Sequence, residues 1–341
     1  MTPPISVDGS DITGTTIDGV EVQAISLDGQ DVFTASEPRV YFVGGDVSGY
    51  RGRAGLRQVT EVNPKSDNIT NYDEGIEQGR CVYPNTRLVS YDKIIYQITT
   101  WDDEESRRDT IYFDPVASDP NDDNGAVTGD TEPPHYQDLA KFGAAVLGNT
   151  CWTIGGNLYG YRDDRQVVGF LNFETEENGM EYRDAPYLME GTVAEAVQGS
   201  IYVLGGRANS SPYTRDTIYK FDPPNSFTEM SATMPFPDES HTSTVMDDKI
   251  YVLQSFGKGV FEYDPISDTI TNLPDFVYKQ GNKAMSSGLG SLYFAAGYNY
   301  DSGDTVNDVH KLNLATGNYS YIGGSGRASR NKCATKIDFA E

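Results

Sequence analysis

The sequence predicts an all-β fold of six repeated four-stranded units, because one type of short apolar strand recurs along most of its 341 residues. Each such strand carries an aromatic residue near its middle, and several end at a glycine pair. The aromatic residues are 42 to 56 positions apart and are Tyr41, Tyr96, Trp152, Tyr202, Tyr251 and Tyr293. A repeat near fifty residues with about four strands is typical of a β-propeller. One unit cannot bury its apolar strand alone, so the units must stack.

The composition agrees with many short strands joined by turns, since the chain has 35 Gly, 17 Pro and 23 Tyr. No apolar run approaches the roughly 18 residues of a membrane span, so we expect no membrane insertion. The start, Met1–Ile5, lacks the charged and apolar tandem of a secretory signal, and we expect none.

The net charge of −25 excludes broad binding to nucleic acids or to anionic membranes, because both surfaces would repel the chain. The basic residues are 15 Arg and only 11 Lys. A strongly acidic surface with few lysines keeps salt-adapted proteins hydrated, so we expect a halophilic origin. The alternative is an acidic surface protein of a mesophile.

Four strands are expected in each unit, as the unit around Tyr202 illustrates. A strand of small residues at 192–197 precedes the glycine-terminated strand at 201–206. A long loop leads to a third strand at 217–223, which ends in Asp-Pro, and a last strand follows at 227–230. Proline removes a ladder donor and aspartate starts a turn, so this dipeptide ends a strand.

This pattern resembles the kelch repeat over residues 40–339, most strongly at 192–223 and 241–265. The resemblance implies a six-bladed kelch-type β-propeller. The sequence departs from the repeat where a glycine pair or the Trp of the last strand is replaced, at Thr99-Thr100, Gln254-Ser255, Tyr72, Tyr182 and Leu273. These departures weaken the count of units rather than the architecture.

The two ends of residues 37–341 are expected to complete one unit together. The first unit begins at Arg39 without a small-residue strand, and residues 329–339 have the character of that missing strand. We therefore expect the C-terminal strand to close the propeller, which would remove its exposed strand edges.

Residues 1–36 form a separate segment in which Asp-Gly pairs recur every ten residues. Asp-Gly is a tight-turn signal, so we expect a small β-ribbon that is too small for its own core. The pairs are Asp8, Gly9, Asp18, Gly19, Asp28 and Gly29. Such runs resemble N-terminal attachment segments of tailed-virus structural proteins, which implies attachment to other virion or tail proteins. A decorative arm is the alternative.

We expect a binding surface formed by two kinds of loop, those that follow the glycine-terminated strands and those that join one unit to the next. Both open on the same face, because strand direction alternates within a unit. Five long loops hold nine of the 15 Arg and many aromatic residues, which are types that carry binding energy at recognition surfaces. The candidates are Tyr50, Arg51, Arg53, Trp101, Tyr159, Tyr161, Arg162, Arg207, Tyr213, Arg215, Tyr298 and Tyr300. The alternative is that loop arginines pair with loop aspartates and only brace the loops.

Catalytic signals are weak, and we expect no enzyme activity. The three histidines lie on different strand types, and hydrolase and nucleotide-binding motifs do not occur. A copper-oxidase propeller needs two Tyr, two His and a cross-linked Cys, and a sialidase propeller needs Asp-box repeats, which this chain lacks. The histidines are His135, His241 and His310.

No cofactor is expected, and a structural Ca²⁺ is the one ion for which a candidate segment exists. Asp119, Asp122 and Asp123 bring hard oxygen ligands together, although a solvated acidic loop explains them better because the twelve-residue EF-hand pattern is missing. The three cysteines have no metal-site spacing and are expected to be inert thiols; they are Cys81, Cys151 and Cys333.

The sequence thus favours a virion surface or tail protein, of a fibre or baseplate, in a virus of a halophilic host. We expect it to be assembled in the host cytoplasm, to be a homo-oligomer within the particle, and to bind a glycan or protein of the host surface. The alternatives are a cellular kelch scaffold that binds proteins, and a carbohydrate-active or copper-oxidase-like propeller enzyme.

Overall fold

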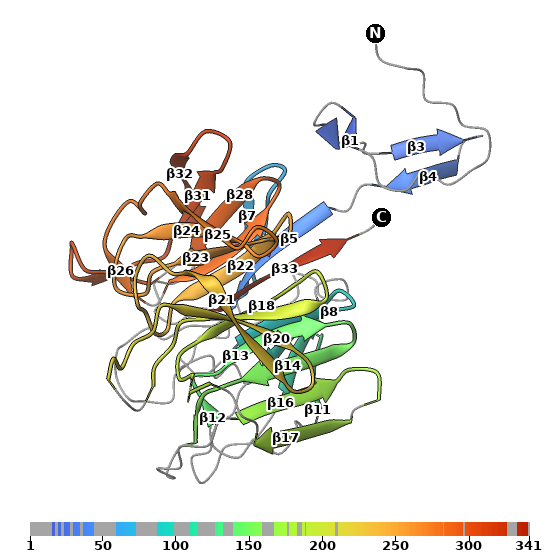
Figure 1. Cartoon of the computed structure of the whole chain (residues 1–341). Helices are drawn as coiled ribbons and strands as arrows, with labels where there is room; N and C mark the ends of the chain where they lie inside the picture. The colour runs from blue at the N-terminus through green and yellow to red at the C-terminus, as the bar shows by residue number, and fades with distance from the viewer. Residues whose placement is uncertain are drawn as a thin grey trace. The chain divides into compact units, whose positions relative to one another are not determined.

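The fold is taken from a computed structural model of the whole chain (Figure 1). The structure describes residues 16–17, 20–21, 24–27, 30–34, 37–43, 59–72, 87–98, 110–114, 127–131, 139–158, 167–175, 177–182, 186–187, 189–208, 211–281, 283–295, 297–325 and 333–339. The chain divides into two compact units, Met1–Glu37 with Asp338–Glu341, and Pro38–Ile337.

In the smaller unit, the described residues form two short hairpins. Strand β1 (Thr16–Ile17) pairs with β2 (Val20–Glu21), and β3 (Ala24–Leu27) pairs with β4 (Gln30–Thr34). In the sequence, Asp18-Gly19 and Asp28-Gly29 separate the paired strands, as expected for tight turns. All six Asp and Gly residues of the expected attachment motif lie outside the described residues.

The larger unit contains six four-stranded antiparallel sheets in its described part. The first has the order β33 (Cys333–Phe339), β5 (Glu37–Val43), β6 (Val59–Asn63) and β7 (Asn68–Tyr72). The second comprises β8 (Arg87–Tyr91), β9 (Ile94–Ile98), β10 (Thr110–Asp114) and β11 (Val127–Thr131). The third comprises β13 (Gly143–Leu147), β14 (Thr150–Ile154), β16 (Val167–Asn172) and β17 (Asn178–Tyr182).

The remaining three sheets repeat the same order. The fourth comprises β18 (Val193–Val197), β19 (Ser200–Leu204), β20 (Thr217–Asp222) and β21 (Ser226–Thr233). The fifth comprises β22 (Thr242–Met246), β23 (Lys249–Leu253), β24 (Val260–Asp264) and β25 (Thr269–Leu273). The sixth comprises β27 (Ala284–Gly288), β28 (Ser291–Ala295), β31 (Asp308–Asn313) and β32 (Asn318–Gly324).

Neighbouring sheets pack in chain order through their first strands, with β8 beside β13, β13 beside β18, β18 beside β22, and β22 beside β27. The described residues contain no helix. The all-β prediction is therefore confirmed, and the repeated four-stranded sheets are consistent with a β-propeller-like fold.

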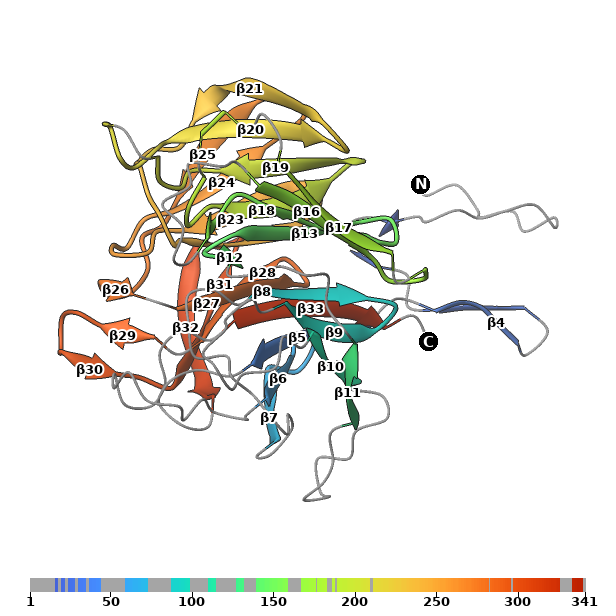
Figure 2. The same cartoon turned by 90° about the horizontal axis from the view of Figure 1, so that it is seen from below.

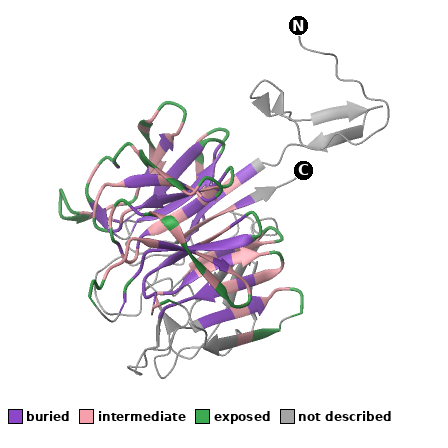
Figure 3. Cartoon of the chain, in the orientation of Figure 1, coloured by how far each residue is buried: buried purple, intermediate pink, exposed green. Residues whose placement is uncertain are grey.

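The second strand of a sheet is buried on both faces, which explains why it is apolar throughout. In β19, Ile201 and Val203 pack toward the third sheet, with Ile154 and Val168. The alternate residues Tyr202 and Leu204 pack toward the fifth sheet instead. Successive strand residues point to opposite faces, so a strand between two other sheets needs an unbroken apolar run. Figure 3 shows this burial concentrated in the strands, with exposed residues in the turns.

The C-terminal strand β33 lies next to β5 and supplies the first strand of the first sheet (Figure 2). The sixth sheet also packs against this sheet, since Tyr293 and Val309 share an apolar cluster with Val40. Lys311 Nζ of β31 lies 2.8 Å from Asp67 Oδ1 in the turn between β6 and β7. The first and last sheets are therefore joined by apolar packing and by an ion pair, and β33, which follows the last sheet in the chain, pairs with β5 of the first.

The turns between third and fourth strands are closed by the Asp and Asn residues that the sequence places there. Asp264 Oδ1 accepts hydrogen bonds from the backbone N–H groups of Ile266 and Ser267 at 2.9 and 3.2 Å. Asn313 Oδ1 accepts one from Thr316 at 2.9 Å. A short polar side chain that bonds its own following backbone stabilises a turn.

No helix long and apolar enough to cross a membrane occurs in the described part of the chain.

Candidate binding face

The loops after second strands and the segments that enter first strands lie at the same end of each sheet, because consecutive strands are antiparallel. We call this end the glycine-end face. Five of the predicted site residues lie in the described residues, namely Arg207, Tyr213, Arg215, Tyr298 and Tyr300. The others lie outside them: Tyr50, Arg51, Arg53, Trp101, Tyr159, Tyr161 and Arg162. The Ca²⁺ candidates Asp119, Asp122 and Asp123, with His135 and Cys81, are also outside.

Short backbone ladders hold the loops of the glycine-end face to one another. Before the third sheet, β12 (Leu139–Ala140) pairs with β15 (Asn157–Leu158). At the fourth sheet, isolated bridges join Arg207 to Glu190 and to Thr214. Before the sixth sheet, β26 (Gln280–Gly281) pairs with β29 (Tyr298–Asn299), which pairs with β30 (Asp304–Thr305). Side chains on these loops are therefore presented from paired backbone.

In the loop between β19 and β20, two arginines lie over tyrosine rings. The Arg207 guanidinium lies 5.7 Å from the Tyr213 ring centroid, and that of Arg215 lies 5.6 Å from the Tyr187 ring centroid. Tyr213 is 56% exposed. Tyr187 donates a hydrogen bond to the Gly205 carbonyl at 2.7 Å, which fixes its ring. Within the described residues neither arginine forms a salt bridge, and each lies over a tyrosine ring instead.

A second group of exposed aromatic residues lies where loops of the fifth and sixth sheets meet. Phe256 and Tyr300 are 50% and 42% exposed, and their ring centroids are 6.2 Å apart. Tyr298 packs edge-on against Tyr300, with centroids 4.9 Å apart. Lys279 Nζ lies 5.9 Å from the Tyr300 ring centroid. We call Phe256, Tyr300 and Lys279 the aromatic patch.

Backbone hydrogen bonds connect the three segments that carry the aromatic patch. Phe276 N–H donates to the Lys258 carbonyl at 2.7 Å, and Gln280 N–H donates to the Gly257 carbonyl at 3.2 Å. Tyr300 N–H donates to the Lys279 carbonyl at 2.9 Å. The patch is therefore built from segments that are fixed relative to one another.

Phe256 and Lys279 were missed by sequence reasoning. The loop at 254–259 is short and lacks the glycine pair, so it did not resemble a binding loop. Lys279 lies in the segment between two sheets, which the search for long loops did not include. The available signal was position, because Phe256 lies five residues after Tyr251, just as Trp101 follows Tyr96 and Tyr298 follows Tyr293.

Gly281 sets the position of the Tyr300 ring, because a Cβ at Gly281 would lie 2.8 Å from Cε2 of that ring. We predict that Gly281→Ala displaces the ring and weakens ligand binding by about threefold to tenfold, the loss of one aromatic contact. The melting temperature should change little, because an exposed side chain can move. Titration of a ligand that binds this face and a thermal melt of both proteins check this, and unchanged affinity would contradict it.

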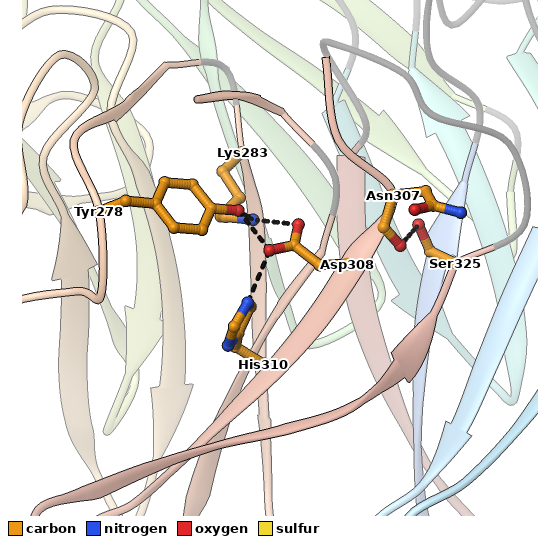
Figure 4. A network of polar contacts seen from close by, with 6 residues as sticks. All are labelled: Tyr278, Lys283, Asn307, Asp308, His310 and Ser325. Atoms are coloured by element: carbon orange, nitrogen blue, oxygen red, sulfur yellow. Dashed lines mark hydrogen bonds and ion pairs between the residues drawn. The ribbon is translucent and has the colours of Figure 1, made fainter. Parts of the chain in front are cut away.

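A partly buried polar network joins the segment before β27, which also carries Lys279, to the start of β31 (Figure 4). Tyr278 donates a hydrogen bond to Asp308 Oδ2 at 2.5 Å, and His310 Nε2 lies 2.6 Å from the same oxygen. Lys283 Nζ lies 3.2 Å from Asp308 Oδ1 and 2.8 Å from the Tyr278 hydroxyl. Asn307, next to Asp308, accepts a hydrogen bond from Ser325 Oγ through its carbonyl at 3.1 Å.

The pKa values in this network show that its charges depend on one another. Burial lowers the pKa of Lys283 to about 8, although the attraction of Asp308 acts against this. Burial alone would raise the pKa of Asp308, but the His310 hydrogen bond and the Lys283 charge outweigh it and hold the value at about 2. The Lys283 side chain is 0% exposed. The network therefore holds the segment that carries Lys279 to the start of β31, and Lys283 offers no surface to a ligand.

Two further ionisable groups are associated with the first strands of the fourth and fifth sheets. Glu195 accepts a hydrogen bond from Ser243 Oγ at 2.6 Å, and burial raises its pKa to about 7. His241, immediately before β22, is 3% exposed, and neither ring nitrogen has a hydrogen-bond partner among the described residues. Burial lowers its pKa to about 3, and the charge of Arg87 acts in the same direction.

Among the side chains that the structure describes there is neither a metal site nor a reactive cysteine. No cluster of three or more His, Cys, Asp or Glu residues in it could hold a metal ion. Cys151 is buried and unpaired, and burial raises the pKa of its thiol to about 12. Such a thiol is unreactive, as expected for Cys151.

Comparison with known proteins finds resemblance in structure but not in sequence. No protein-family model matches the sequence, and no curated protein matches it. A solved structure, that of YjhT, superposes with a TM-score of 0.48 at 13% sequence identity. The match covers 57% of this chain and 68% of the YjhT chain.

Proposed function

We propose that the six sheets form a closed six-bladed propeller of the kelch type. The pairing of β33 with β5 and the Lys311–Asp67 ion pair support closure, because both join the chain ends of the larger unit. The strand order repeats in every sheet, and the aromatic residue of the repeat lies on each second strand. Closure would leave no sheet edge between the first and sixth blades.

On this fold, we propose a non-enzymatic binding protein of a virion surface or tail, in a virus with a halophilic host. Its glycine-end face would bind a glycan of the host envelope, and residues 1–36 would attach it to other virion proteins. The observation that carries the binding proposal is the aromatic patch. Exposed aromatic rings on hydrogen-bonded loops suit stacking on the apolar faces of sugars, and recognition surfaces concentrate such residues.

The aromatic patch lies on loops that are hydrogen-bonded to one another, and this supports a binding role over loops that only brace the fold. Three chain segments are connected by backbone hydrogen bonds so that Phe256 and Tyr300 lie within 6.2 Å, with half of Phe256 in solvent. Rings that are fixed before binding lose little conformational freedom in the complex. The network of Tyr278, Lys283, Asp308 and His310 adds a further connection to the segment that carries Lys279.

The test is a glycan microarray probed with the labelled full chain and with the double variant Phe256→Ala, Tyr300→Ala. We expect the variant to lose about 30-fold or more in affinity for the bound glycans, because two central aromatic contacts are removed. Ile266→Ala is the matched control. Ile266 is 68% exposed in the turn between β24 and β25, at the opposite end of the fifth sheet.

Two results would contradict the proposal. Equal glycan binding by the double variant and by the wild type would exclude the aromatic patch. Absence of binding to every glycan, together with patch-dependent capture of a defined protein, would favour the cellular scaffold instead. Conversion of a bound sugar into a product would favour the enzyme.

A further inference from the structure

Cations in the described part of this acidic protein are mostly paired with carboxylates. Seven Lys and Arg side chains form salt bridges to Asp or Glu, and these are Arg39, Lys141, Lys220, Lys249, Lys258, Lys283 and Lys311. With 51 acidic residues against 26 basic ones, such pairing is expected.

Three cations of the glycine-end face lie over aromatic rings instead. Lys279, Arg207 and Arg215 are each placed over a tyrosine ring, at 5.9, 5.7 and 5.6 Å, and none forms a salt bridge with a described residue. Nε of Arg215 is buried and has no hydrogen-bond partner among the described residues. The rings attract the cations without neutralising them. The charge of Lys279 also acts on the carboxyl of Asp301, whose pKa is lowered by the Lys279 backbone N–H, by Lys258 and by Lys279 itself.

A ligand that supplies acid groups would complete these three sites. A cation over a ring keeps donors available for a carboxylate or sulfate, and a charged hydrogen bond is stronger than a neutral one. At the patch, Phe256 lies beside Tyr300, so a sugar ring stacked there would place its acid substituent near Lys279. The carboxylate of Asp301 lies close to Lys279, but it already forms a salt bridge with Lys258 and accepts a hydrogen bond from the Lys279 backbone N–H.

The Arg207–Tyr213 pair provides a second position of the same chemistry. It lies on a loop of the fourth sheet, whereas the aromatic patch is built by the fifth and sixth sheets. We propose that the ligand is an acidic glycan, a chain of sugars bearing carboxylate or sulfate groups, held at both positions by ring stacking and by Lys279, Arg207 and Arg215. This proposal rests on the glycan-binding function proposed above and names the class of sugar.

The experiment compares oligogalacturonate with its methyl ester as probes, titrated against the full chain at constant ionic strength. The two probes share sugar rings and differ in charge. We expect the acid form to bind at least about tenfold more tightly, and Lys279→Gln and Arg207→Gln each to cost about tenfold for the acid form alone. Added salt should reduce this preference. Lys65→Gln, in the turn between β6 and β7, is the control for a lost surface charge and should change neither affinity.

The outcomes separate this inference from the function on which it rests. Equal binding of acid and ester, or binding of neither, overturns the acidic class. Patch-dependent binding to neutral glycans on the microarray would still leave the proposed function standing. Equally tight binding of oligoglutamate would show that charge alone is recognised, and would overturn the glycan. Loss of acid binding in Lys65→Gln would place the effect outside this face.

Discussion

Deletion of residues 329–341 is expected to lower the melting temperature by at least about 10 °C, or to abolish the cooperative transition. Loss of β33 removes the first strand of a four-stranded sheet and leaves β5 as its edge. Val40, Tyr41, Phe42 and Val43 of β5 are at most 1% exposed. Exposure of even part of this strand costs several kcal/mol, since one buried large apolar side chain contributes about 1.5–3 kcal/mol.

Scanning calorimetry of the two proteins at one pH and salt concentration measures this effect. Deletion of residues 340–341 alone is the control, because β33 ends at Phe339, and its transition should match that of the full chain. A chain lacking 329–341 that melts at the wild-type temperature would contradict the closure of the propeller by its C-terminal strand.

Acid is expected to destabilise the protein through His241, with a large contribution from this one side chain. Its pKa is about 3 in the folded state, below the 6.5 of an unperturbed histidine. The unfolded chain therefore binds the proton first as the pH falls. The stabilisation is complete above about pH 6.5 and is lost as the pH falls toward 3, at about 1.4 kcal/mol per pH unit at the steepest.

The substitution His241→Phe isolates this contribution, because the chain itself places Phe142 immediately before β13, where His241 stands before β22. Urea unfolding of both proteins from pH 3 to 7 gives the difference in slope. Glu195 has the opposite effect on stability, because burial raises its pKa to about 7 and the folded chain therefore takes up this proton first as the pH falls from about 7 to 4.5. The effect is present in both proteins, so it cancels in the comparison. Parallel curves for the two proteins would show that His241 takes up its proton without cost in the folded state.

Much of the fold could be predicted because each apolar strand lies between two sheets. Tyr41, Tyr96, Trp152, Tyr202, Tyr251 and Tyr293 all lie on second strands, of β5, β9, β14, β19, β23 and β28. The strands expected at 192–197 and 217–223 are β18 and β20, within one residue at their ends. Burial on both faces imposes a continuous apolar run, which is a strong local signal.

The candidate site could be predicted only in part, because its contacts join segments distant in sequence. The arginines and tyrosines of the 207–216 loop were visible as residue types, but the pairing of Arg215 with Tyr187 was not. The network of Tyr278, Lys283, Asp308 and His310 spans about thirty residues and has no fixed spacing that a motif search detects. Phe256 acquires meaning only when Tyr300, 44 positions further on, lies beside it.

Hydrogen–deuterium exchange tests most directly whether ligands bind at the glycine-end face. The full chain should be compared alone and with the tightest-binding glycan of the microarray. We predict slower exchange in residues 254–259, 279–281 and 298–303, and no change in the turns at 247–248 and 265–268. Protection confined to those turns, at the opposite end of the fifth sheet, would contradict the claim.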